Sequence, residues 1–105
     1  MAVNIDDIKF LAKKLAGLKM KKFSSLSEIK DYYDSLAISL IDLDSKDDQL
    51  MDTLKSASKY FNYLNVDDFK TDDQQKLNES KAVISQVAKV LNSILVKWRK
   101  EHGNL

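Results

Sequence analysis

The sequence predicts an all-α protein, an antiparallel up-down four-helix bundle with a long C-terminal helix. Three observations lead to this prediction. The 105 residues include no proline and two glycines, so the two strongest helix breakers are almost absent. Apolar residues recur at steps of three and four along most of the chain, which is the spacing of one helix face. No alternating apolar run is bounded by turn residues, so no strand is expected.

The first helix is expected at about residues 5–17. Asn4 can cap its N-terminus, and Asp6 and Asp7 occupy the first turn, where the helix dipole favours acidic side chains. Gly17 is expected to end this helix, because glycine readily adopts the left-handed conformation found at many helix C-termini. The apolar stripe of the helix comprises Ile5, Ile8, Leu11, Leu15 and Leu18.

The second and third helices are expected at about residues 26–43 and 46–64. Ser25 and Glu28 form a capping-box pattern at the start of the second helix. The helical spacing of apolar residues then continues through both segments. The apolar positions are Leu26, Ile29, Tyr33, Leu36, Leu40 and Leu43 in the second segment and Leu50, Leu54, Ala57, Phe61 and Leu64 in the third.

The connection between these helices has two interpretations, because the heptad register of the second helix continues into the third without a phase break. In the first, residues 44–48 form a tight turn, and Asp44 or Ser45 caps the third helix. In the second, residues 26–64 form one helix, and the resulting long helical hairpin dimerises to cover its apolar face. The turn is favoured, because Asp and Ser prefer caps and turns, and Asp47 would otherwise be a carboxylate in an apolar seam.

The last helix is expected at about residues 72–102. Thr71 and Gln74 form a second capping-box pattern before it, and Gly103 is expected to end it. The chain is therefore expected to form a single helical domain over residues 1–105. The apolar stripe of the last helix comprises Leu77, Ile84, Val87, Leu91, Ile94 and Trp98.

The composition excludes several classes of protein. The net charge of +1 gives no overall attraction to nucleic acid or to anionic membranes. The absence of cysteine excludes a disulfide scaffold, a thiolate metal site and a cysteine nucleophile. No run of 18 apolar residues occurs, so no stable membrane insertion is expected. The N-terminus carries acid where a signal peptide carries positive charge, so a cytoplasmic location is expected.

The sequence contains few residues that are suited to catalysis or to binding a metal or cofactor. His102 is the only histidine and lies near the C-terminus, where it cannot be held in place as a base. Two glycines are too few for a phosphate-binding loop or a dinucleotide fingerprint. The acidic stretch 42–47 begins like a calcium loop, but Lys46 takes a ligand position and the required glycine is absent. We expect no enzyme activity, no catalytic residues, no metal site and no cofactor.

Aromatic side chains offer candidate interaction residues. Tyrosines and phenylalanines occur as sequence neighbours at 32–33 and 60–63, so they cannot all face one core. Those on the flanks either line the edge of the core or anchor a partner protein. The last helix is longer than the first helix can cover, so an apolar patch near its C-terminus is expected to protrude. The candidate interaction residues are Tyr32, Tyr60, Tyr63, Leu95 and Trp98.

Two basic patches form a second set of candidates. In an up-down bundle, the first of them shares one end with the acidic stretch 67–73, and the second shares the other end with the acidic stretch 42–48. The patches are either solvated helix ends or contacts for nucleic-acid phosphates, although the chain has a single arginine. Their members are Lys13, Lys14, Lys19, Lys21 and Lys22 in the first patch and Lys97, Arg99 and Lys100 in the second.

Two protein families offer a resemblance. Tyr63 and Asp67 match the Tyr-x-x-x-Asp/Glu signal of small helical-hairpin substrates of type VII secretion, but the Trp-x-Gly turn of those proteins is missing. In length and predicted architecture the chain resembles bacteriocin immunity proteins, which are cytoplasmic four-helix bundles, and no site residue is carried over from them.

The sequence therefore predicts a non-catalytic protein that acts by protein–protein interaction. Its expected role is that of an immunity-, inhibitor- or antitoxin-like protein, or of a phage or secretion accessory protein. The alternative function is that of a nucleic-acid-binding accessory protein. The partner is expected to be another protein of unknown identity, and the chain is expected to be a monomer or a homodimer.

Overall fold

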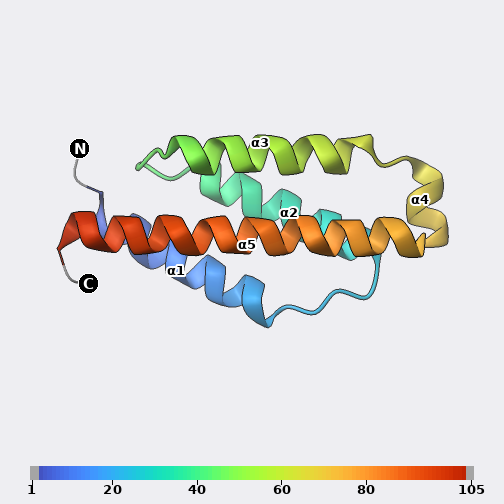
Figure 1. Ribbon diagram of the computed structural model, residues 1–105, viewed down its shortest axis with the longest axis horizontal. Helices are drawn as coiled ribbons and strands as arrows, with labels where there is room; N and C mark the ends of the chain where they lie inside the picture. Colours follow the sequence, from blue (N-terminus) through green and yellow to red (C-terminus); the bar gives the residue numbers. More distant parts are fainter. Residues whose placement is uncertain (1–2, 104–105) are drawn as a thin grey trace.

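Five helices make up most of the computed structural model, which describes residues 3–103. They are α1 (Ile5–Met20), α2 (Leu26–Ile41), α3 (Asp48–Tyr63), α4 (Val66–Thr71) and α5 (Gln74–His102). The four long helices run up, down, up and down, and α5 extends along the whole molecule with α1, α2 and α3 packed against it (Figure 1). Residues 3–103 contain no strand. The all-α bundle with a long C-terminal helix is therefore confirmed.

The turn between α2 and α3 decides between the two interpretations of the middle of the chain. Residues 42–47 leave the helix, so the single helix over residues 26–64 is wrong. Asp47, rather than Asp44 or Ser45, caps α3 and accepts a hydrogen bond from the Leu50 amide at 3.0 Å. The Ser45 amide instead donates to Asp7 of α1 at 2.6 Å, which ties the turn to the first helix.

Gly17 does not end α1, contrary to the prediction. The helix continues to Met20 and ends because Lys21 adopts an extended backbone, with φ −78° and ψ 133°. The additional turn buries Leu18 in the core, and this burial outweighs the intrinsic cost of a glycine inside a helix.

The connection between α3 and α5 contains the short helix α4, which the apolar spacing did not predict. Asn65 and Asp68 form its capping box, and Asp72 follows it in the left-handed conformation. Asp73 then caps α5, so the pattern Thr71–Gln74 is not a capping box. None of the residues of α4 is buried, so no apolar stripe marks it in the sequence.

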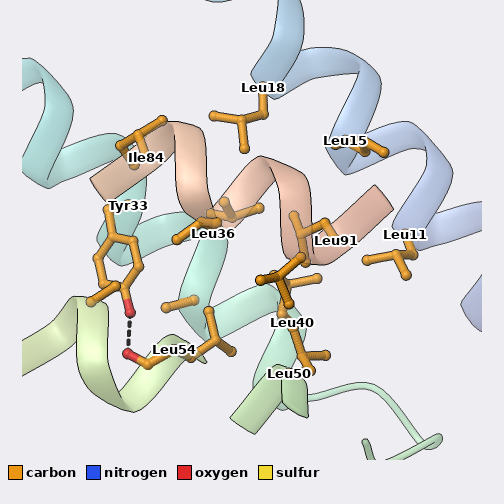
Figure 2. Packing of buried hydrophobic residues seen from close by; sticks show 14 of the residues in the cluster. Leu11, Leu15, Leu18, Tyr33, Leu36, Leu40, Leu50, Leu54, Ile84 and Leu91 are labelled. Carbon is orange, nitrogen blue, oxygen red and sulfur yellow. Dashed lines mark hydrogen bonds between the residues drawn. The ribbon is translucent and has the colours of Figure 1, made fainter. Parts of the chain in front are cut away.

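One hydrophobic core is shared by the four long helices. Figure 2 shows leucines of α1, α2 and α3 gathered around α5. The buried Tyr33 ring stacks on Phe61 with ring centroids 4.9 Å apart, and its hydroxyl donates to the Leu54 carbonyl at 2.5 Å. The core therefore joins α2 to α3 through a hydrogen bond as well as through apolar contact.

Polar contacts join distant segments at both ends of the bundle, and at one of the ends the contact is the predicted pairing of a basic with an acidic segment. At one end, the Leu26 amide at the start of α2 donates to Asp72, which follows α4, at 2.9 Å. At the other end, Lys97 of α5 forms an ion pair with Asp47 in the α2–α3 turn. In residues 3–103, every helix is too short or too polar to cross a lipid bilayer.

Candidate functional site

A groove with an apolar floor and a lysine rim lies between the end of α1 and the first half of α5. Its volume is about 570 Å³. The C-terminus of α1, the α1–α2 connection and α5 each contribute residues to it. The floor comprises Leu18, Phe23, Ile84 and Ala88, and the rim comprises Lys19, Lys21, Lys22, Lys81 and Ser85.

Local structure explains how the groove is formed. Because α1 ends at Met20, Lys21 and Lys22 lie in an extended stretch that leads to α2. Phe23 in the same stretch packs edge-on against Tyr32 of α2, with ring centroids 5.4 Å apart. Leu18 and Ile84 belong to the core, so a packed interior supports the groove from beneath.

None of the four lysines of the rim forms an ion pair within the part of the chain that the structure describes. In residues 3–103 the ion pairs are Lys30–Asp34, Lys76–Glu79 and Lys97–Asp47, and none of them includes a lysine of the groove. Four ammonium groups around one concave apolar surface produce a positive potential that attracts anionic groups. The groove is therefore suited to a ligand that combines carboxylates or phosphates with an apolar group.

A second pocket lies farther along the contact between α1 and α5. Its volume is about 270 Å³, and it is lined by Ile5, Ile8, Lys9, Ala12 and Arg99. It has the same character as the groove, with an apolar lining and basic side chains.

Comparison with protein-family models, with curated proteins and with solved structures finds no match. Within residues 3–103, no group of three or more histidine, cysteine, aspartate or glutamate side chains is placed to hold a metal ion.

The first predicted basic patch is divided by the structure. Lys19, Lys21 and Lys22 line the groove, but Lys13 and Lys14 do not. The Lys14 ammonium lies over the ring of Phe10, 5.2 Å from its centroid.

The second predicted basic patch lies at the other end of the bundle and is also divided. Lys97 is paired with Asp47, Arg99 lines the second pocket, and Lys100 is exposed. Sequence reasoning missed Lys81, because its place in the groove depends on the antiparallel packing of α1 against α5.

Two of the candidate interaction residues are buried, contrary to the prediction of an exposed apolar patch. Leu95 is 4% exposed and Trp98 is 2% exposed. The end of α5 is covered because Val3, which precedes α1, and the α2–α3 turn pack around it, and both line a common pocket with Trp98. These two side chains belong to the core.

The three tyrosines have different environments. The Tyr60 hydroxyl donates to the Lys76 carbonyl at 3.2 Å, which links α3 to α5, and burial raises its pKa. Tyr32 is half-buried behind the groove, where burial raises the pKa of its hydroxyl. Tyr63 is 69% exposed, with the Lys76 ammonium 4.8 Å from its ring centroid. Of the five candidates, Tyr63 alone presents most of its side chain to solvent.

Proposed function

We propose that this protein is a non-catalytic binding protein and that its groove receives an acidic segment of another protein. The observation that carries the proposal is the set of four lysines, without ion-pair partners in residues 3–103, around an apolar floor. Carboxylates of the partner would meet the lysines, and an apolar side chain would occupy the floor beside Phe23. Electrostatic complementarity of this kind speeds association and selects partners.

The apolar floor favours a protein over nucleic acid. A leucine or phenylalanine side chain gains about 1.5–3 kcal/mol when it is fully buried, and a phosphate backbone has no such group to offer. Nucleic acid is the second candidate, because the same lysines suit phosphates and Phe23 is placed among them to stack on a base. The two predicted basic patches lie at opposite ends of the bundle, and Lys97 is already paired, which weakens this alternative.

The proposal extends to the biological role. Immunity-, inhibitor- and antitoxin-like proteins, and phage or secretion accessory proteins, act by holding another protein rather than by changing it. We propose a cytoplasmic location, since cytoplasmic proteins rarely depend on disulfides and this chain has no cysteine to form one. It would act there as a monomer or as a homodimer.

The proposal is tested by titrating the isotope-labelled protein with a flexible peptide of glycine, glutamate and leucine. We expect amide shifts in the NMR spectrum to concentrate at Leu18, Phe23 and Ser85. The double variant K19E/K81E should bind the peptide about tenfold more weakly, because both charges are reversed. K55E/K89E is the matched control, since it reverses the same number of charges at two exposed lysines outside the groove.

Two outcomes would contradict the proposal. If the peptide shifts no resonance of the groove, or if K55E/K89E weakens binding as much as K19E/K81E does, the groove is not the binding site. A short DNA duplex is titrated in parallel. Binding that falls steeply between about 50 and about 200 mM salt, without any binding of the peptide, would favour the nucleic-acid alternative.

A further inference from the structure

The groove and the second pocket lie along one continuous contact between α1 and α5. Four α5 residues of the two pockets are separated by steps of four, three and eleven. They are Lys81, Ser85 and Ala88 in the groove and Arg99 in the second pocket. These steps keep a helix residue on the same face. On α1, steps of four, three and seven keep four further lining residues on one helix face. They are Ile5, Lys9, Ala12 and Lys19. The two pockets therefore open on the same side of the α1–α5 pair.

The charged side chains that line the two pockets are all basic. The charged residues among the lining side chains of the two pockets are Lys9, Lys19, Lys21, Lys22, Lys81 and Arg99. The acidic residues of α5 make contacts elsewhere: Glu79 forms an ion pair with Lys76, and Glu101 lines the pocket around Trp98. Asp7 of α1 is bonded to the α2–α3 turn.

The distance between the two pockets determines how far apart two anchors on a partner helix must be. Along α5, the centre of the groove near Ser85 and the second pocket at Arg99 are separated by a rise of about 21 Å, and along α1 the corresponding rise is about 15 Å. A partner helix covers these distances with about ten to fourteen residues. A spacing of about eleven residues, which is three turns and a rise of about 16.5 Å, lies within this range and keeps two anchors on one face of the helix.

We infer that the acidic partner segment is an amphipathic α-helix that lies along the α1–α5 pair, with one apolar anchor in the groove and a second about eleven residues away in the pocket beside Arg99. The inference rests on the proposed function and specifies the form of the partner. A helix is favoured over an extended segment because it satisfies its own backbone hydrogen bonds. The backbone groups of α1 and α5 are already used within those helices, and residues 3–103 provide no strand edge to pair with.

The test uses synthetic peptides rich in alanine and glutamate, each with two leucines, and measures their affinity by fluorescence anisotropy. In the first peptide the leucines are about eleven residues apart on one helix face. In the second they are moved to opposite faces, and in the third a central proline breaks the helix. We expect the first peptide to bind about tenfold more tightly than the other two, because it alone buries both leucines.

Variants of the protein separate this inference from the proposed function. K9E/R99E reverses both charges of the second pocket and leaves the groove intact. It should weaken the first peptide about tenfold and leave the flexible peptide unaffected. Equal affinities for the three peptides, together with normal binding of the flexible peptide, would overturn the inference and leave the proposed function standing. If the flexible peptide also fails to bind, both are wrong.

Discussion

Lys97 of α5 forms an ion pair with Asp47, the residue that caps the N-terminus of α3. The Asp47 side chain is 5% exposed, whereas that of Lys97 is 50% exposed. The carboxylate has two roles, because it accepts a hydrogen bond from the Leu50 amide and also pairs with the ammonium group. This arrangement explains how an acid is tolerated where the heptad register would place an apolar residue.

Replacing Asp47 separates its two roles. D47A removes both the cap and the ion pair, and we expect it to lower the free energy of unfolding by about 1–2 kcal/mol. D47N should cost less than half as much, because asparagine also caps helices and can accept from the Leu50 amide. Urea unfolding measures both values. D44A is the control, since Asp44 is an exposed acid of the same turn, and equal losses for D47N and D47A would show that the ion pair dominates.

The same residue predicts a dependence of stability on pH. Burial raises the pKa of Asp47, but hydrogen bonds from Lys97 and from the Leu50 amide outweigh it, so that its pKa lies below its ordinary value. The resulting stabilisation is present above the unfolded pKa of about 3.9 and is lost as the pH falls through the lowered folded pKa. Urea unfolding at several pH values between about 7 and about 2 should therefore show a larger loss for the wild-type protein than for D47N. Parallel losses would contradict this prediction.

The two glycines should respond in opposite ways to the same substitution. Gly17 lies inside α1, and an added Cβ would be 3.5 Å from the Tyr32 hydroxyl oxygen, an ordinary van der Waals distance. G17A should therefore raise the free energy of unfolding by roughly 0.5–1 kcal/mol, because alanine is the better helix former. Gly103 caps α5 with φ +82°, so G103A should lower stability. Thermal unfolding compares the two variants, and a destabilised G17A would show that the site near Tyr32 cannot accept a methyl group.

Features that depend on spacing along the chain could be predicted from the sequence. The stripes that contain Leu11, Tyr33, Leu54 and Leu91 identified the four long helices, because a buried face leaves a period in the sequence. The short helix α4 could not be found in this way, since it buries no residue. The end of α1 was misplaced because a local preference of glycine was outweighed by the burial of Leu18, which is a tertiary effect.

Features that depend on packing between distant segments could not be predicted in detail. The sequence identified Lys19, Lys21 and Lys22 as a basic cluster, but Lys81 and the floor residues Ile84 and Ala88 come from α5. The relative lengths of the first and last helices predict that Trp98 protrudes, but the chain at Val3 and the α2–α3 turn cover the end of α5. Both features depend on contacts between residues more than forty positions apart.

The burial of Trp98 leads to a last prediction. It is the only tryptophan, so the intrinsic fluorescence of the folded protein should be blue-shifted and resistant to quenching by iodide. W98A should lower the free energy of unfolding by about 3–5 kcal/mol, because it removes a large side chain from a packed interior. Y63A should change stability by less than about 0.5 kcal/mol, since Tyr63 is mostly exposed. A quenchable tryptophan, or a W98A variant as stable as Y63A, would show that the end of α5 is open and would return Leu95 and Trp98 to the candidate interaction surface.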